Sequence, residues 1–270
     1  MRALPKGRLG RDARGEVLML PRVFVDAPGG ASRVVTLAGD DGHHFARVLR
    51  VQNGEPLVVV TPTGPWLGEI SAVAKDAVDV FLKEPYPSAE PRCEVVVVQG
   101  LAKGDKMETI VQKCTEVGAS LFVLYGADRS VVKLAGKVEA KLARWQKVAR
   151  EAAMQSQRDK VPVIRYESKL ALVCESLIAE GVEQLVVLDE AEDAVGLTTA
   201  LSKVPVEGDR RIKRALFVGP EGGWSEAERD YFASCEKACL VTLGRRILRT
   251  ETAGVVGLAV TLAHFGDMGG

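Results

Sequence analysis

Residues Cys93–Gly118 read CEVVVVQGLAKGDKMETIVQKCTEVG and decide the fold class of the larger part of the chain. The run Cys93–Val98 is continuously apolar, which is typical of a strand buried on both faces of a parallel sheet. Asp105 and Glu108 predict a capping box at the start of a following helix, and Gly118 predicts its end. Apolar residues recur between them at helical spacing, namely Met107, Ile110, Val111, Cys114 and Val117.

The same alternation of strand and helix continues along the chain. Helical spacing predicts a long helix from Lys137 to about Gln157, and Ser225 with Glu228 predicts a second capping box, which opens a helix ending near Lys237. Strands that alternate with helices predict an α/β fold, in which a mostly parallel sheet is covered by helices on both faces. The further apolar runs that predict strands are Leu121–Tyr125, Leu185–Leu188, Ala215–Val218 and Cys239–Leu243.

The chain before residue 92 has a different pattern, in which short β-branched or alternating runs are separated by Gly and Pro. Strands at this spacing suggest a small closed or half-closed barrel. A short helix is expected over His43–Arg50, ended by Asn53-Gly54. The predicted strands are Val23–Asp26, Val34–Leu37, Leu57–Val60, Trp66–Ser71 and Val78–Leu82.

The three prolines in Lys83–Pro91 indicate a stiff linker between two domains. We therefore expect a small β domain over residues 21–84 and an α/β domain over residues 92–270. Residues 1–20 form an N-terminal extension that we expect to be flexible. It is basic, but Asp12 and Glu16 interrupt its positive charge and no long apolar run follows, so a secretory signal is not expected. An organellar transit peptide is the alternative to a disordered basic arm.

Composition excludes several classes of protein. The chain has 36 basic and 36 acidic side chains, so a net charge of zero disfavours a simple electrostatic clamp on nucleic acid. The five cysteines include no CxxC pair and there are only three histidines, which predicts neither a metal site nor a disulfide scaffold. The most apolar stretch, Thr252–Phe265, is shorter than the roughly 20 residues that span a membrane. We expect a cytoplasmic protein.

Ligands of open parallel sheets bind beyond the carboxyl ends of the strands, and two such ends are unusual here. The first is Phe217–Ser225, FVGPEGGWS, whose glycines let a ligand approach the main chain while Glu221 is held inside the turn. A tight strand-to-helix turn without a ligand is an equally good interpretation of this segment alone.

The second unusual end is Leu243–Ala253, LGRRILRTETA, which precedes an almost entirely apolar helix, Ala253–Phe265. Such a helix should be buried nearly all round. Thr250 is suited to cap it, and Glu251 suits the dipole of its first turn. These roles leave the arginines unexplained, because charges beside a buried helix are costly unless they are paired or bind a charged partner. The three are Arg245, Arg246 and Arg249.

Missing motifs narrow the choice of ligand. No GxGxxG follows a strand and no P-loop lysine motif is present. His43, His44 and His264 offer no convincing Ser–His–Asp arrangement. The two loops therefore predict a site unlike an ordinary dinucleotide-binding site.

GPEGGWSEAE at Gly219–Glu228 and LGRRILRTETA at Leu243–Ala253 closely resemble the two cofactor signatures of the RsmE family. These are SPOUT-class enzymes that use S-adenosylmethionine to methylate N3 of one uridine in 16S ribosomal RNA of the small subunit. The resemblance covers roughly residues 21–266, in the order of the family. Its further segments are RVFVD at Arg22–Asp26, HHFARVLRVQNGE at His43–Glu55, KGDKMETIVQKCTEVG at Lys103–Gly118, RSVVK at Arg129–Lys133 and RWQKVAREAAMQSQRDKVP at Arg144–Pro162.

The resemblance implies a PUA-like N-terminal barrel, a SPOUT domain whose last segments form a trefoil knot, and a homodimer with the cofactor pocket near the subunit interface. The family often has EQSGR where this chain has MQSQR at Met154–Arg158, so its Glu and Gly are Met and Gln here. The residues that would contact S-adenosylmethionine are Leu188, Gly219, Pro220, Glu221, Gly223, Leu243, Gly244, Ile247, Leu248, Arg249, Thr252 and Ala253.

N3 of uracil carries a proton and lies on the base-pairing edge, so the target must be unpaired or flipped out. The sulfonium is already a strong electrophile, and the enzyme must position the reactants and stabilise an imide anion. We predict that Arg249 supplies the cation. Because arginine stays charged, the proton leaves to water or to a carboxylate such as Glu221 or Glu251.

Charge and resemblance together predict RNA contacts, which should weaken with salt. Three other interpretations stay open: a SPOUT enzyme acting on a ribose 2′-hydroxyl or on transfer RNA, a non-catalytic RNA-binding ribosome assembly factor, and a nucleotide-dependent metabolic enzyme that binds phosphate with GPEGG. The predicted RNA contacts are Arg22, Arg50, Lys103, Lys106, Arg129 and Arg158.

Overall fold

The structure is a computed structural model that describes residues 10–11, 17–18, 20–26, 33–132, 136, 138–204 and 210–269. The chain divides into two compact units, of which the first is Met1–Ala89 with Gln157–Asp159 and the second is Glu90–Ser156 with Lys160–Gly270. Most of the N-terminal extension lies outside the described residues, as do Lys133 and Lys137. The flexibility expected of the extension therefore stays a prediction.

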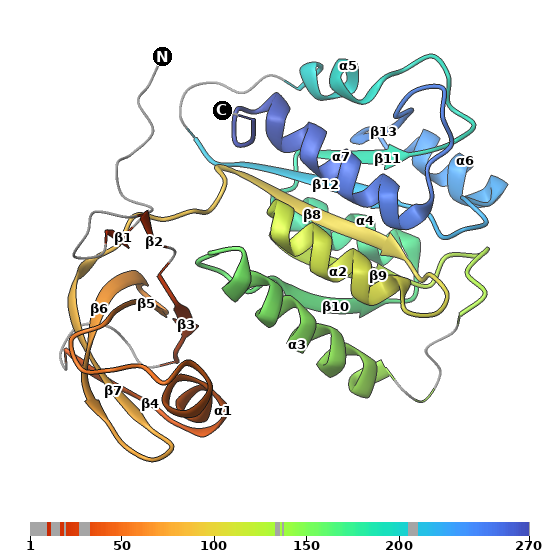
Figure 1. Ribbon diagram of the computed structural model, residues 1–270. Helices are drawn as coiled ribbons and strands as arrows, with labels where there is room; N and C mark the ends of the chain where they lie inside the picture. The colour runs from red at the N-terminus through yellow and green to blue at the C-terminus, as the bar shows by residue number, and fades with distance from the viewer. Residues whose placement is uncertain are drawn as a thin grey trace. The chain divides into compact units, whose positions relative to one another are not determined.

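The first unit is a curled five-stranded sheet in the order β3-β5-β6-β7-β4 (Figure 1). Its strands are β3 (Arg22–Phe24), β4 (Val34–Leu37), β5 (Pro56–Thr61), β6 (Gly64–Val73) and β7 (Val78–Pro85). β3 pairs with β5 in parallel, and the other neighbours are antiparallel. The strands predicted for this part of the chain are confirmed. Among the described strands, β3 and β4 are the edges of the sheet, so the barrel is half-closed.

Two further elements belong to the first unit. β1 (Gly10–Arg11) and β2 (Val17–Leu18) form a separate antiparallel pair. The predicted helix is present as α1 (Gly39–His43) and a π-helical continuation, η1 (His44–Leu49), which ends at Arg50 with φ 53°. Phe45 of η1 is buried against β-strand residues of this unit, among them Val59 and Val80.

The second unit is an entirely parallel six-stranded sheet in the order β10-β9-β8-β12-β11-β13. The chain order reverses between β8 and β12. Because neighbouring strands are parallel, the carboxyl ends of β8, β12, β11 and β13 lie side by side at one edge of the sheet. This confirms the predicted α/β fold. The strands are β8 (Cys93–Gly100), β9 (Leu121–Tyr125), β10 (Val163–Glu167), β11 (Gln184–Leu188), β12 (Ile212–Val218) and β13 (Ala238–Val241).

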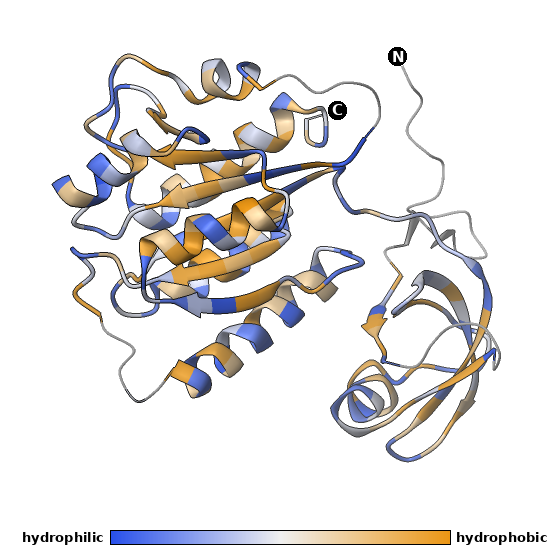
Figure 2. Cartoon of the chain, turned by 180° about the vertical axis from the view of Figure 1, so that it is seen from behind, coloured by the Kyte–Doolittle hydropathy of each residue, from blue (hydrophilic) through white to orange (hydrophobic). Residues whose placement is uncertain are grey.

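Helices cover both faces of this sheet, as predicted (Figure 1). One face packs against α2 (Lys106–Val117), α3 (Val138–Gln155), α5 (Leu197–Ser202) and α7 (Thr250–His264). The other face packs against α4 (Leu170–Ala179) and α6 (Glu226–Ser234). The strands between the two helical layers are strongly hydrophobic (Figure 2). The trefoil knot implied by the resemblance stays a prediction.

Helix starts differ from the predictions in two of three cases. Ser225 and Glu228 form the predicted capping box of α6. Asp105 precedes α2, but its side chain makes no capping hydrogen bond because its backbone (φ −84°, ψ 4°) lacks the extended conformation of a capping residue. Arg249, and not Thr250, is the N-cap of α7. Thr250 is already helical, and its hydroxyl donates to the Gly219 carbonyl instead, at 2.6 Å.

The expectation that the last helix is buried nearly all round is wrong for the single chain. One face of α7 is buried, where Gly257 packs so closely that a Cβ atom would lie 3.0 Å from the side chains of Leu188 and Leu216. On the remaining surface, Val256 and Ala259 are only partly buried and Ala263 is exposed. Small residues thus bring one face of α7 close to the sheet, while an apolar face of the same helix stays uncovered.

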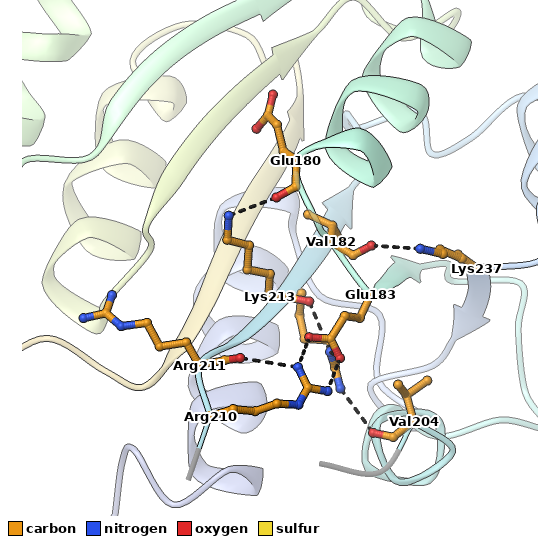
Figure 3. A network of polar contacts seen from close by, with 9 residues as sticks. Glu180, Val182, Glu183, Val204, Arg210, Arg211, Lys213 and Lys237 are labelled. Atoms are coloured by element: carbon orange, nitrogen blue, oxygen red, sulfur yellow. Dashed lines mark hydrogen bonds and ion pairs between the residues drawn. The ribbon is translucent and has the colours of Figure 1, made fainter. Parts of the chain in front are cut away.

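Four basic residues, Arg210, Arg211, Lys213 and Arg214, lie at the amino-terminal edge of the sheet, where Arg210 pairs with Glu183 (Figure 3). Arg214 of β12 is 0% exposed, and its Nη1 lies 3.1 Å from Glu183. Arg210 donates to both oxygens of the same carboxylate, at 2.7 and 2.9 Å. These hydrogen bonds, the one from Arg210 first, lower the pKa of Glu183 to about 2. Arg214 therefore has a structural role, as the buried counter-ion of Glu183.

Gln157 is one of two described non-glycine residues with positive φ, here 61°, and it stands where the related family often has glycine. Because a side chain costs about 1–2 kcal/mol in this conformation, Gln157→Gly should raise the free energy of unfolding by about 0.5–1 kcal/mol after the extra entropy of the unfolded chain is subtracted. Urea denaturation measures this. Lys147→Gly, inside α3, is the control and should lower stability by about 1 kcal/mol. Equal destabilisation by both substitutions would contradict the argument.

Candidate active site

A cavity of about 700 Å³ opens where β11, β12 and β13 end. Residues of both predicted loops line it, drawn from Gly219–Gly223 in the first and from Leu243–Ala253 in the second. Of the predicted cofactor contacts, only Thr252 is not among the lining residues. Those that line the cavity are Leu188, Gly219, Pro220, Glu221, Gly223, Leu243, Gly244, Ile247, Leu248, Arg249 and Ala253. The two sequence segments thus form one site.

The first loop is anchored by Trp224. Its indole is 0% exposed, stacks on Tyr125 and donates a hydrogen bond of 2.9 Å to the carbonyl of Leu188 at the end of β11. Gly223 has φ 66°, a conformation that favours glycine, and its N–H closes the turn on the Pro220 carbonyl at 2.9 Å. The loop is therefore held rigidly, with main-chain atoms facing the cavity.

Gln99 joins the two loops to each other, and sequence reasoning missed it. Its side chain is completely buried, and Nε2 donates to Thr250 Oγ1 at 2.9 Å. The Thr250 hydroxyl in turn donates to the Gly219 carbonyl. The end of β8, the loop after β12 and the start of α7 are thereby linked. The sequence did contain a signal for this role, because Gln99 is a polar residue directly after the apolar run Val95–Val98.

Asp189, directly after β11, is also a residue that the sequence did not single out. It is 5% exposed and accepts two hydrogen bonds from Arg229 of α6, at 2.8 and 2.9 Å. With Glu190, Glu192 and Asp193 it forms an acidic wall of the cavity.

Positive charge lines the second loop. Arg245, Arg246 and Arg249 face the cavity and are exposed, and none forms an ion pair with a described residue. Ile247 lies between them with 84% of its surface exposed. Arg249, the predicted catalytic cation, occupies the N-cap of α7. A ligand in this cavity thus meets carboxylates on one wall and free guanidinium groups on another.

Glu221 lies beside Lys106, and their charges are coupled. Lys106 Nζ is 3.1 Å from Glu221 Oε1 and 3.4 Å from Glu251 Oε2. The same Glu221 oxygen accepts from the Lys103 N–H at 3.1 Å. Desolvation alone would raise the pKa of Glu221, but the hydrogen bonds from backbone N–H groups and Lys106 outweigh it and lower that pKa. This weakens Glu221 as a general base, the tentative role expected for it.

The predicted RNA contacts fall into three groups. Lys103 and Lys106 adjoin Glu221, and Arg129 donates to the Gly222 carbonyl at 3.1 Å, so these three border the site. Arg50 is exposed on the first unit. Arg22 and Arg158 are each 5% exposed; Arg22 is paired with Asp159 and donates to the Arg158 carbonyl. Their burial gives both a structural role within the first unit.

Within the part of the chain that the structure describes, no cluster of three or more His, Cys, Asp or Glu residues is arranged to hold a metal ion. The described helices include none with the length and apolar character needed to cross a membrane.

Comparisons with known proteins agree over most of the chain. Residues 89–262 match the RNA methyltransferase domain family, and residues 37–83 match the RNA methyltransferase PUA domain family. Ribosomal RNA small subunit methyltransferase E of Bacillus subtilis (strain 168) is 34% identical, over 83% of this chain and 88% of that protein. Its Mycobacterium tuberculosis (strain CDC 1551 / Oshkosh) counterpart is 30% identical, over 87% of this chain and 88% of that one.

Similarity to a solved structure extends the agreement to three dimensions. The crystal structure of ribosomal RNA small subunit methyltransferase E from Neisseria gonorrhoeae, bound to S-adenosyl methionine, superimposes with a TM-score of 0.72 at 26% identity. The superposition covers 89% of this chain and 96% of the Neisseria gonorrhoeae chain.

Proposed function

Since the chain belongs to the RNA methyltransferase family that includes ribosomal RNA small subunit methyltransferase E, we propose that it transfers a methyl group from S-adenosylmethionine to N3 of one uridine in 16S ribosomal RNA. The observation that carries this proposal is the single cavity shared by Gly219–Gly223 and Leu243–Ala253.

The donors and acceptors of the cavity suit S-adenosylmethionine. Main-chain groups of both glycine-containing loops offer hydrogen bonds to the adenine and ribose. The acidic wall is complementary to the positively charged sulfonium and amino groups, and nearby arginines are complementary to the cofactor carboxylate. The bound cofactor supplies the electrophilic methyl group. The residues of the chain hold it and orient the uracil.

The protein has to stabilise the uracil as its N3–H proton leaves. Arg249, charged and unpaired among the described residues, is placed to contact a uracil carbonyl oxygen that becomes negative. Lys106 pairs with both Glu221 and Glu251, and Glu221 also accepts from the Lys103 N–H, so we expect the proton to pass to water and not to either carboxylate. Lys103 and Arg129 would hold the RNA backbone beside the cavity mouth, and Arg50 would contact it from the first unit.

The decisive experiment is nucleoside mass spectrometry of 16S rRNA. Cells that lack the protein should lose one N3-methyluridine, and purified protein with S-adenosylmethionine should restore it in small subunits or in free rRNA. A 2′-O-methylated nucleoside or a modified transfer RNA would favour another SPOUT activity. Cofactor binding without any methylation would favour an RNA-binding assembly factor.

Gly100 should contribute to cofactor affinity by allowing the first loop to pack closely. A Cβ atom at Gly100 would lie 2.6 Å from Pro220 Cδ and 2.7 Å from Pro220 N, so Gly100→Ala must displace the first loop. We expect S-adenosylmethionine to bind about 10-fold more weakly, measured by calorimetry, because loop contacts worth about 1.4 kcal/mol are lost. Gly196→Ala is the matched control, since the nearest atom to its Cβ would be 4.0 Å away. Unchanged affinity in Gly100→Ala would contradict the loop model.

We also propose that the chain is a homodimer that acts in the cytoplasm, where ribosomal subunits assemble. The uncovered face of α7, with Val256, Ala259 and Ala263, supports a self-association surface. Val256→Glu would bury a charge there and should convert a dimer to a monomer at micromolar concentration, as measured by light scattering. A wild-type monomer, or a dimer unaffected by the substitution, would contradict this interface.

A further inference from the structure

Lys106 carries a charge that the helix dipole, taken alone, disfavours. It is the first residue of α2, and a cation in the first turn of a helix opposes the helix dipole. Its side chain is still 30% exposed and lines the cavity, so burial does not explain it. A charge held against the dipole, at the edge of the site, has to be compensated by other groups at this position.

Two carboxylates from different segments fix the Lys106 ammonium. Glu221 comes from the loop after β12 and Glu251 from the first turn of α7, with Nζ at 3.1 and 3.4 Å from their respective oxygens. The hydrogen bond to Glu221 is the main cause that raises the pKa of Lys106, so the amine stays protonated and cannot act as a base. Glu251 Oε2 is buried and forms no hydrogen bond among the described residues, so the ion pair with Lys106 compensates its charge.

An ammonium group has three N–H donors, so two carboxylates engage at most two of them and leave at least one for a ligand. N3 of uracil lies between two carbonyl groups, and the negative charge of its anion is shared between both oxygens. Arg249 can neutralise only one of them well. The opposite side of the base needs a second donor, and Lys106 lines the same cavity as Arg249.

We infer that Lys106 is a second catalytic cation, whose free N–H donates to one uracil carbonyl while Arg249 contacts the other. This inference rests on the proposed function. The uracil N3–H bond breaks and its proton passes to water. The N3 electron pair then forms the bond to the methyl carbon as the S–C bond breaks, leaving S-adenosylhomocysteine. Glu221 and Glu251 are positioning residues that aim the ammonium group.

The test compares two substrates that differ in the acidity of N3–H. Lys106→Met removes the charge at similar length, and we expect kcat on a uridine-containing RNA to fall about 100-fold, as when one donor to a developing oxyanion is lost. An RNA with 5-fluorouridine at the target has a more acidic N3–H, so its anion needs less stabilisation. On this RNA the loss of kcat in Lys106→Met should shrink to less than 10-fold. On the uridine-containing RNA, the pH profile of kcat for Lys106→Met should shift to higher pH.

Three readouts separate this role from others. Calorimetry should give S-adenosylmethionine affinity within a few fold of wild type, which confirms that the site is folded. Lys113→Met, which removes a surface ion pair with Glu116 on the same helix, should leave all parameters unchanged. An equal loss on both RNAs, or an increase in KM alone, would overturn the inference in favour of a structural or phosphate-binding lysine. If wild-type protein forms no N3-methyluridine, the proposed function itself fails.

Discussion

Arg249→Ala should reduce kcat by about 100- to 1,000-fold while S-adenosylmethionine affinity changes by no more than a few fold. The large effect follows from the chemistry, because a preorganised cation beside a developing anion stabilises the transition state by about 3–4 kcal/mol. The small effect on binding is expected because many residues besides Arg249 line the cavity and are available to contact the cofactor. Single-turnover methylation with saturating cofactor measures the first, and calorimetry the second.

The design of this experiment separates charge from shape. Arg249→Lys retains the positive charge but not the planar pair of donors, so its activity should lie between those of wild type and alanine. Loss of cofactor binding in Arg249→Ala would mean that the arginine holds the N-terminus of α7 and not the uracil. Undiminished turnover would exclude a catalytic role.

The site was the most predictable part of the molecule. FVGPEGGWS and LGRRILRTETA both follow apolar strands, and the carboxyl ends of parallel strands are where such folds bind ligands. Glycine and unpaired arginine are residue types that a simple turn or a buried helix does not require. The shared cavity of these loops therefore followed from local patterns, even though no pattern gives the strand order β8-β12-β11-β13 that brings them together.

The residue roles that the sequence did not reveal depend on partners that lie far away along the chain. Gln99 acquires its role through Thr250, 151 residues away, and Asp189 through Arg229, 40 residues away. Charge alone does not distinguish an arginine that faces solvent from one that meets a buried carboxylate, which is why Arg22 was expected to bind RNA. β10 was not predicted because Val163–Glu167 is an edge strand with mixed polarity.

Glu183→Ala should lower the free energy of unfolding by about 3 kcal/mol, the largest stability effect that we expect, because it leaves the fully buried Arg214 without its counter-ion. Arg214 would keep its hydrogen bonds to the carbonyls of Lys213 and Val204, at 3.1 Å each, but its buried positive charge would be left uncompensated. Glu180→Ala, which breaks the exposed pair with Arg165, is the control and should cost less than about 1 kcal/mol.

The same interaction should appear as a pH dependence. The pKa of Glu183 falls from 4.5 to about 2 in the folded protein, so the unfolded chain binds this proton first as the pH drops. The stabilisation is complete above pH 4.5 and is lost as the pH falls toward 2. Glu183→Ala should therefore unfold with a shallower loss of stability over that interval, measured by urea denaturation at successive pH values. If stability fell with pH in the same way in wild type and in Glu183→Ala, another group would have to neutralise Arg214. The Glu183–Arg214 pair would then not stabilise the start of β12.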